Sequence, residues 1–245
     1  ICACLVGSEM CIRDRFQVID LPYLFNDRAA AYKALDGKLG QTLNDQILPK
    51  GVRLLCFPEN GFRQITNNKA PIKSPADLKG VKVRVQPIPA HLELFKAFGA
   101  NPTPVDFGEL YTALLQKTVD AQENSITLIY SSKLYEVQKY LTMSNHVYAP
   151  SAVFMSEAFY KRLPADLQKI VMDGAKKFRD ASRANQQKEG DRLLKEMVEK
   201  NGLKVYSPTD AEMKQFRDAA QSVYKTMEPV LGKELIDMAR EANKK

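Results

Sequence analysis

Hydrophobic and polar positions follow two different periods along the chain. Apolar side chains alternate in VKVRV (81–85) and run together in GVRLLCF (51–57), patterns that are typical of short buried strands. Between such runs, the stretches 27–47 and 90–99 place apolar residues three or four positions apart, as in amphipathic helices. The repeated change between these two periods predicts a mixed α/β fold.

Three sequence patterns indicate where helices begin. In SPADLKG (74–80), Ser74 can act as an N-cap ahead of a proline that suits the first helical position. Asp106 with Glu109, and Thr209 with Glu212, have the three-residue spacing of a capping box. We therefore expect helices to begin just after each of these caps.

The stretch from Pro164 to Asn201 has a helical pattern for most of its length, with Gly174 and Gly190 inside it. A helix of this length is unusual in a globular domain. It is therefore expected either to span two lobes or to break at Gly190.

Charge and composition narrow the class of protein. The 245 residues are 44% hydrophobic, and no apolar run approaches the roughly 20 residues that a membrane-spanning helix requires. The net charge is +7, but basic residues alternate with acidic ones in segments such as DGAKKFRD (173–180), as on a solvated helix face. Because no basic block is interleaved with aromatic residues, the sequence does not predict a nucleic-acid partner.

The first fifteen residues, ICACLVGSEMCIRDR, differ from the remainder of the chain. They contain Cys2, Cys4 and Cys11, show no helical or strand period, and lack the features of a secretory signal. EMCIRDR (9–15) resembles the in-frame translation of a sequencing-library adapter. We therefore expect residues 1–15 to be foreign, Cys56 to be the one native cysteine, and no disulfide framework or export signal to be present.

Few residues are available for catalysis or metal binding. The chain has two histidines, His91 and His146, and no cysteine pair outside the first fifteen residues, so a zinc site is not expected. The serine-hydrolase, P-loop and dinucleotide-binding signatures do not occur in the sequence. An acid–base group made of Asp120, Glu123 and His146 is the alternative that would make the protein an enzyme.

Arg84 raises a question of charge balance. It follows Val83 in a predicted buried strand, where an arginine requires an anion, a water pocket or solvent, because an unpaired buried charge is costly. Polar residues gather where extended segments end and helices begin, and such junctions favour an anionic ligand. The residues alone leave an internal pairing of Arg84 with Asp77 or Glu109 as an alternative. We expect a binding protein rather than an enzyme.

Six segments of the chain resemble one known family, in sequence and in order. Similar segments occur in the solute-binding receptors of tripartite ATP-independent periplasmic (TRAP) transporters, the DctP-like group, and the resemblance covers nearly everything from Phe16 to the end. The segments are DLPYLF (20–25), NGFRQITN (60–67), DLKGVKVRV (77–85), GANPTPVDFGELYTALLQKTVDAQEN (99–124), YEVQKYLTMSNH (135–146) and LPADLQ (163–168).

The resemblance implies a periplasmic receptor with a two-lobed α/β fold of the periplasmic-binding-protein kind. Its lobes are joined by a hinge and a long connecting helix, close over an organic acid such as a C4-dicarboxylate, and deliver it to a TRAP permease in the membrane. On this basis we expect residues 16–60 with about 150–189 to form lobe I, and about 61–149 with about 190–245 to form lobe II. A monomer without cofactor or metal is expected, and the alternative is a small-acid-processing enzyme on a two-lobed α/β fold.

The resemblance also implies four ligand-binding residues. Arg84 resembles the arginine that clamps the ligand carboxylate, and Asn124 resembles the asparagine that braces the same group. Arg63 resembles a second cationic contact, and Phe107 an aromatic wall of the pocket. Arginine suits the clamp because its planar fork donates two parallel hydrogen bonds to a carboxylate.

Each of these residues also has a purely structural interpretation. Asn124 can be the N-cap of a helix that starts near Ser125, Arg63 can be exposed, and Phe107 can be a hydrophobic plug. Three neighbouring polar residues are interpreted as structural support: Gln122, Glu123 and His146.

The chain departs from the family pattern at two positions. Ala121 stands where the family has glycine, and Ser125 stands where it has proline. Without the proline, the direction of the Asn124 side chain is open. Family members also begin well upstream of DLPYLF, so we expect the first lobe to be incomplete in this chain.

Overall fold

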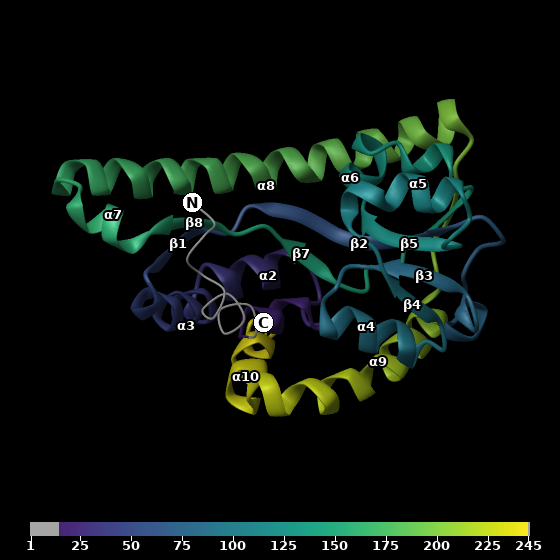
Figure 1. The fold of residues 1–245 in the computed structure, drawn as a ribbon, viewed down its shortest axis with the longest axis horizontal. Helices are drawn as coiled ribbons and strands as arrows, with labels where there is room; N and C mark the ends of the chain where they lie inside the picture. The colour runs from purple at the N-terminus through teal and green to yellow at the C-terminus, as the bar shows by residue number, and fades with distance from the viewer. Residues whose placement is uncertain (1–14, 245) are drawn as a thin grey trace.

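The computed structural model describes residues 15–244 (Figure 1). Helices and short strands alternate along the chain, which confirms the predicted α/β class. The expected foreign leader lies outside the described residues, apart from Arg15.

The helical elements differ widely in length. The α-helices are α2 (Arg28–Leu35), α3 (Lys38–Ile47), α4 (Pro89–Ala97), α5 (Leu110–Leu115), α6 (Ile126–Ser131), α7 (Glu157–Arg162), α8 (Ala165–Asn201), α9 (Asp210–Leu231) and α10 (Lys233–Glu241). The 3₁₀ turns are η1 (Gln17–Asp20), η2 (Leu48–Lys50), η3 (Pro75–Leu78), η4 (Phe107–Glu109) and η5 (Leu134–Glu136).

The larger sheet has seven strands in the order β4, β3, β5, β2, β6, β9, with β7 paired to β2. They are β2 (Glu59–Asn67), β3 (Lys82–Val85), β4 (Asn101–Pro104), β5 (Ala121–Ser125), β6 (Tyr140–Thr142), β7 (Tyr148–Pro150) and β9 (Lys204–Tyr206). Strand β3 runs parallel to β4 and β5, whereas β2 runs antiparallel to β5, β6 and β7. The carboxyl ends of β3, β4 and β5 therefore meet at one edge, which is the usual ligand crevice of an α/β sheet.

The two faces of the larger sheet pack against different helices. On one face, Val83 lies in a core cluster with Phe95 of α4 and Phe216 of α9. On the other face, Leu141 belongs to a second cluster that includes Leu114 of α5 and further residues of α6 and α8. Because side chains alternate along a strand, the valines around Arg84 enter the first core while Arg84 itself faces the second side.

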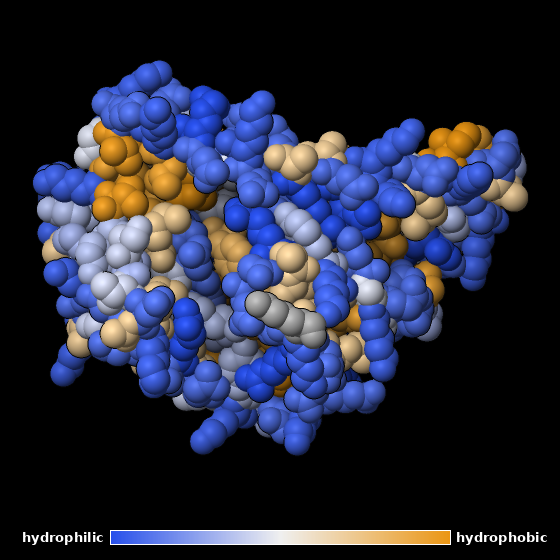
Figure 2. All heavy atoms as spheres, turned by 180° about the vertical axis from the view of Figure 1, so that it is seen from behind, coloured by the Kyte–Doolittle hydropathy of each residue, from blue (hydrophilic) through white to orange (hydrophobic). Residues whose placement is uncertain are grey.

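The smaller sheet consists of β1 (Val52–Cys56) paired antiparallel with β8 (Val153–Ser156). Two strands alone are marginally stable, so this sheet depends on the helices around it. Large apolar side chains remain exposed on β8, α7 and the first half of α8: Phe154, Phe159, Leu167, Ile170 and Phe178. The face shown in Figure 2 is largely hydrophilic and carries a few hydrophobic clusters.

The long helix α8 runs without interruption through Gly190 and lies along the top of the molecule in Figure 1. Near its middle, Arg183 donates hydrogen bonds to Asp36 (2.6 and 2.9 Å) and to the carbonyl of Phe57 (3.0 Å). One turn later, Gln186 donates to Thr127 at the start of α6 (2.8 Å). The helix therefore contacts both the part of the fold that contains Asp36 and Phe57 and the part that contains α6. It spans the two parts, as one of the two predicted alternatives has it, and does not break at Gly190.

The capping predictions have different outcomes. Thr209 and Glu212 form a capping box at the start of α9, and the carboxylate of Asp77 accepts from the backbone N–H of Ser74 ahead of η3 (2.9 Å). The side chain of Asp106 makes no capping hydrogen bond, so the box predicted for that position is wrong. The chain there enters the 3₁₀ turn η4.

Within residues 15–244, no helix combines the length and the apolar character that crossing a membrane requires.

Candidate functional site

Arg84 lies at the centre of the candidate site. It is fully buried on β3, between Thr103 of β4 and Gln122 of β5 in the sheet register. Its Nε donates to the carbonyl oxygen of Val105 (2.8 Å), whereas its Nη1 is buried without a hydrogen-bond partner. The guanidinium is thus held in place at one nitrogen and left unsatisfied at another.

No carboxylate of residues 15–244 forms an ion pair with Arg84. The Asp77 carboxylate binds the backbone N–H groups of Lys73 and Ser74 instead (2.8 and 2.9 Å), so it is not the partner. Burial lowers the pKa of Arg84 even though Glu123 contributes a favourable negative charge. Because a buried cation without an adjacent anion is costly, Nη1 is the atom of Arg84 that an anion would stabilise.

Asn124 is fully buried near the end of β5, on the same side of the sheet as Arg84. Its Nδ2 donates to Oε1 of Gln122 (2.9 Å), and its Oδ1 has no donor. The N-cap position of α6 is occupied by Ser125, so the interpretation of Asn124 as the cap is wrong. The amide oxygen is therefore a second unsatisfied polar atom in this region.

Phe107 is the first residue of η4 and is 42% exposed. The carbon at the centre of the Arg84 guanidinium lies 5.9 Å from the centroid of the Phe107 ring. An aromatic ring at this distance stabilises a cation through its quadrupole. The exposure rules out the interpretation as a buried plug and leaves Phe107 as a surface ring above Arg84.

Arg63 is buried on β2, so the interpretation as an exposed side chain is wrong. Its Nε and Nη2 both donate to the carboxylate of Glu123, and Nη2 also donates to the Glu123 carbonyl oxygen (2.7 Å). Arg63 and Glu123 come from adjacent antiparallel strands whose register brings them to the same side. The positive charge of Arg63 is therefore compensated within the protein, unlike that of Arg84.

Glu123 is shared among three basic side chains. His146 Nε2 lies 3.0 Å from one carboxylate oxygen, and His91 Nδ1 lies 3.6 Å from the other. Burial favours the neutral acid, but Arg63 and the two histidines outweigh it and hold the pKa of Glu123 well below its usual range. Glu123 is therefore an anion fixed by its neighbours, consistent with the structural role predicted for it.

The two histidines differ in charge. Burial lowers the pKa of His146 despite its contact with Glu123, so its neutral ring donates to Glu123 from Nε2 and accepts from Ser144 at Nδ1 (2.8 Å). His91 lies 3.6 Å from Asp20 and from Glu123, within ion-pair range but longer than a hydrogen bond. Burial opposes its charged form, yet the two carboxylates raise the pKa of His91 to about 9.

The structure brings together only part of the acid–base group considered from sequence. Glu123 and His146 meet, but Asp120 accepts from the backbone N–H of Lys82 (3.1 Å) instead. Sequence reasoning did not connect His91 or Asp20 to the site. Asp20 comes from η1, about 70 residues away from His91, and no pattern in the sequence indicates that the two approach each other.

A cavity of about 270 Å³ borders Arg63 and His91. Gln86, which follows β3, and Asp20 of η1 also line it, so the cavity lies between the carboxyl edge of the sheet and the first part of the chain. Arg84 does not line this cavity. The strand register places Arg84, with Gln122 and Asn124, on the opposite side of the sheet from Arg63.

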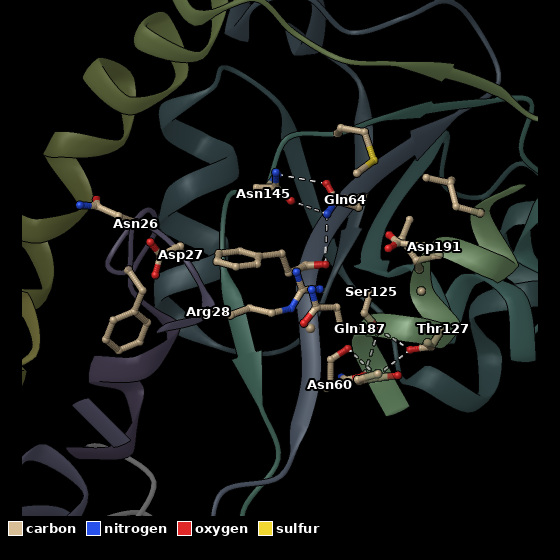
Figure 3. Close-up of a pocket in the computed structure, with 18 of the residues that line it drawn as sticks. Asn26, Asp27, Arg28, Asn60, Gln64, Ser125, Thr127, Asn145, Gln187 and Asp191 are labelled. Carbon is tan, nitrogen blue, oxygen red and sulfur yellow. Dashed lines mark hydrogen bonds between the residues drawn. The ribbon is translucent and has the colours of Figure 1, made fainter. Parts of the chain in front are cut away.

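A larger cavity of about 890 Å³ borders the other side of β2 (Figure 3). Phe62 and Gln64 line it, whereas Arg63 between them lines the smaller cavity, as the alternation along a strand requires. Asn60 lines both cavities. The labelled side chains in Figure 3 are mostly amides and hydroxyls with charges of both signs, among them Arg28 and Asp191.

No group of three or more His, Cys, Asp or Glu side chains in the described part of the chain could hold a metal ion.

Comparisons with known proteins give a consistent result. Residues 8–229 match the family model described as bacterial extracellular solute-binding protein, family 7. The 2,3-diketo-L-gulonate-binding periplasmic protein of Escherichia coli is 40% identical over 202 residues, which are 82% of this chain and 61% of that protein. The C4-dicarboxylate-binding protein of Bacillus subtilis is 34% identical over 219 residues, covering 89% of this chain and 63% of that protein. The chain thus spans less than two thirds of the length of these relatives.

Solved structures agree with the sequence relatives. A TRAP periplasmic solute-binding protein from Shewanella oneidensis with bound succinate has a TM-score of 0.89 and 34% identity, covering 94% of this chain and 75% of that one. A second such protein, from a Polaromonas species and bound to D-erythronate, has a TM-score of 0.88 and 35% identity, covering 96% and 76%. The fold described above is therefore that of TRAP periplasmic solute-binding proteins.

Proposed function

The chain belongs to family 7 of the bacterial extracellular solute-binding proteins, and we propose that it acts as a periplasmic receptor that binds an organic acid by its carboxylate. The proposed site lies where the carboxyl ends of β3, β4 and β5 meet, on the side of the sheet that carries Arg84 and Asn124. Solute-binding relatives with bound succinate and D-erythronate support this class of ligand.

The observation that carries the proposal is the charge of Arg84. Two basic side chains line the smaller cavity: Arg63 is compensated by Glu123, and His91 lies between Asp20 and Glu123. Arg84 has no such anion, and its buried Nη1 lacks an acceptor. A ligand carboxylate would supply both the missing negative charge and the missing acceptor.

The other predicted residues have distinct roles in this proposal. Phe107 forms a wall beside the carboxylate and shields the Arg84 guanidinium from water. Asn124 contributes a polar contact from the neighbouring strand. Arg63 lines the cavity as a hydrogen-bond donor whose charge is already balanced, so its contribution to binding is smaller than that of Arg84.

We further propose that ligand binding closes two lobes around a hinge, with the boundaries predicted from the sequence. Strand β2 and helix α8 pass between the two parts of the fold and are the natural elements to bend. Closure requires that the acid contact both lobes, because a ligand indifferent to the two states shifts no population. The closed form would then deliver the acid to a TRAP permease.

The enzyme alternative is weaker on this geometry. The Glu123–His146 pair is the only acid–base pair that the structure assembles from the three predicted residues, and both members are fully buried. Glu123 is also held by two hydrogen bonds from Arg63. The burial of both groups and the low pKa of Glu123, which makes it a weak base, argue against a catalytic role.

The proposal is tested by calorimetric titration of the protein with succinate, D-erythronate and galactonate, followed by NMR of the recovered acid. A receptor binds one equivalent of at least one acid, gains thermal stability and returns the acid unchanged. Loss of the acid with appearance of a product would show an enzyme. Absence of binding by all three acids, with no shift in the unfolding temperature, would contradict the receptor.

A further inference from the structure

The larger cavity is built from residues other than those proposed to bind the acid. Its volume of about 890 Å³ lies within the range of small-molecule sites, and neither Arg84 nor Asn124 lines it. Its walls come from β2, from α8 and from the segments at the starts of α2 and α9 (Figure 3). A molecule held in this cavity would therefore contact both parts of the fold without occupying the place proposed for the acid.

Two residues of the cavity wall have a left-handed backbone conformation. Tyr23 has a φ of +52° and Asn145 a φ of +43°. Asparagine tolerates this region, but a bulky aromatic residue there is a genuine outlier. The backbone N–H of Tyr23 donates to the carbonyl oxygen of His146 (2.8 Å), so the two left-handed segments hold each other in place. Backbone strain of this kind gathers at ligand sites, which favours a functional role for this wall.

The Asn145 side chain presents a hydrogen-bond donor to the cavity. The backbone N–H of Asn145 donates to one end of the Gln64 amide (3.1 Å), and because an N–H only donates, that end is Oε1. The other end is then Nε2, which donates to Asn145 Oδ1 (2.6 Å) and to the carbonyl oxygen of Phe62 (3.2 Å). This arrangement fixes the exposed Asn145 amide with its Nδ2 turned away from Gln64.

The Gln186 side chain on α8 presents an acceptor to the same cavity. Its Nε2 donates to the carbonyl oxygen of Asn60 (2.8 Å) and to the Thr127 hydroxyl (2.8 Å). Because a carbonyl only accepts, the bonded atom is the nitrogen, and Oε1 is the end left to accept from a ligand. The Ser125 hydroxyl donates to Asn60 Oδ1 (2.9 Å), which joins these groups in one network.

The wall of the larger cavity is electrically balanced. Its charged side chains are two acids and two bases, so its formal charge is zero: Asp27, Asp191, Arg28 and Arg217. Arg28 is in addition paired with Glu59 (2.7 Å). A balanced wall gives no preference for an anion, in contrast to the surroundings of Arg84.

We propose that the larger cavity is a second binding site, which takes a neutral polyhydroxylated molecule, a sugar or a cyclic polyol. Each hydroxyl of such a molecule both donates and accepts, which matches the donor on Asn145 and the acceptor on Gln186. Phe25 and Phe62, which also line the cavity, offer apolar ring surface to its carbon atoms. The site does not depend on the acid-binding role proposed above.

Saturation-transfer difference NMR of the whole protein with D-galactose, trehalose and myo-inositol tests the proposal. At about 10 mM of each probe, a site with a Kd in the millimolar range transfers saturation to its ligand. We expect a signal for at least one probe, which persists when succinate is added at the same concentration and in the variant Arg84→Met. Absence of a signal for all three probes would overturn the proposal. Loss of the signal on addition of succinate would also overturn it, because the two ligands would then share one site.

The variant Asn145→Gly tests whether the sugar or polyol occupies this cavity. Glycine adopts the left-handed backbone freely, so the substitution removes the amide without disturbing the turn. Titration with the probe that the parent binds most tightly should show affinity weakened at least about threefold, the effect of one lost hydrogen bond. The matched control is Lys117→Gly, an exposed left-handed position (φ +60°) that does not line the cavity, and it should keep the parent affinity. Parent-like affinity in Asn145→Gly, or an equal loss in both variants, would overturn the assignment to this cavity.

Discussion

Arg63 and Glu123 form a bidentate ion pair between adjacent strands, with side chains only 1% and 0% exposed. The same carboxylate lies next to His146 and His91, so one anion organises three basic groups at the edge of the sheet. Arg84, one strand further, has no comparable partner. The contrast between a satisfied and an unsatisfied arginine is the physical basis for assigning the ligand carboxylate to Arg84.

Replacement of Glu123 by Gln is expected to destabilise the fold strongly. The change leaves the buried Arg63 charge without its anion, and breaking a buried ion pair in this way costs about 3 to 5 kcal/mol. The matched control is Asp218→Asn, which breaks the exposed pair of Asp218 with Lys214 and should alter the free energy of unfolding by less than about 0.5 kcal/mol. Urea denaturation measures both, and equal effects would contradict the role given to Glu123.

His91 predicts a loss of stability at high pH. Its pKa is raised from 6.5 to about 9 in the folded protein, because Asp20 and Glu123 outweigh the effect of burial. The stabilisation is therefore fully present below pH 6.5 and is lost as the pH rises through about 9. Denaturation of the parent and of His91→Gln across this range measures it. The difference between the two should shrink as the pH rises; a growing difference would refute the ion pairs.

Phe107 is expected to matter for binding and not for folding. Because its ring is 42% exposed, Phe107→Ala should change the free energy of unfolding by less than about 1 kcal/mol, while weakening acid binding through loss of the wall above Arg84. Phe178→Ala on α8, where the ring is 55% exposed, is the control and should leave binding unchanged. Unimpaired titration of Phe107→Ala would exclude the residue from the site.

The two capping positions provide a paired test of the fold. Thr209→Ala removes the N-cap of α9 and should cost about 1 kcal/mol, whereas Asp106→Ala removes a side chain that makes no capping bond and should cost less than about 0.5 kcal/mol. Thermal and urea denaturation compare the variants. A larger loss for Asp106→Ala would show that its side chain has a role not visible in the geometry.

Local sequence signals predicted much of the fold. The strand around Arg84, the caps at Ser74 and Thr209, and the long helix from Pro164 to Asn201 all depend on residues close together in the chain, and the structure contains each of them. The spacing at Asp106 was misleading, because residues at capping-box spacing need not form the hydrogen bonds. Asp77 bonds back to Ser74 ahead of the 3₁₀ turn η3, whereas Asp106 makes no such bond ahead of the 3₁₀ turn η4.

The partners within the site could not be predicted from local patterns. Arg63 meets Glu123 because β2 runs antiparallel beside β5, and that strand order joins residues 60 positions apart. Asp20 reaches His91 for the same kind of reason. Periodicity assigns a residue to one face of a strand but does not identify its neighbours on other strands. Arg84 could therefore be named from the sequence as the candidate clamp, but which of the charged residues around it are paired with one another could not be predicted.

The most direct test of the account is a titration of Arg84→Lys and Arg84→Met with the acid that binds the parent most tightly among succinate, D-erythronate and galactonate. Truncating one partner of a buried charged pair costs about 2 to 5 kcal/mol, so Arg84→Met should bind at least about 30-fold more weakly. Arg84→Lys keeps the charge but loses the bidentate fork and should also bind more weakly than the parent. Circular dichroism establishes that both variants fold. Parent-like affinity in a folded Arg84→Met protein would contradict the central claim that this guanidinium holds the carboxylate.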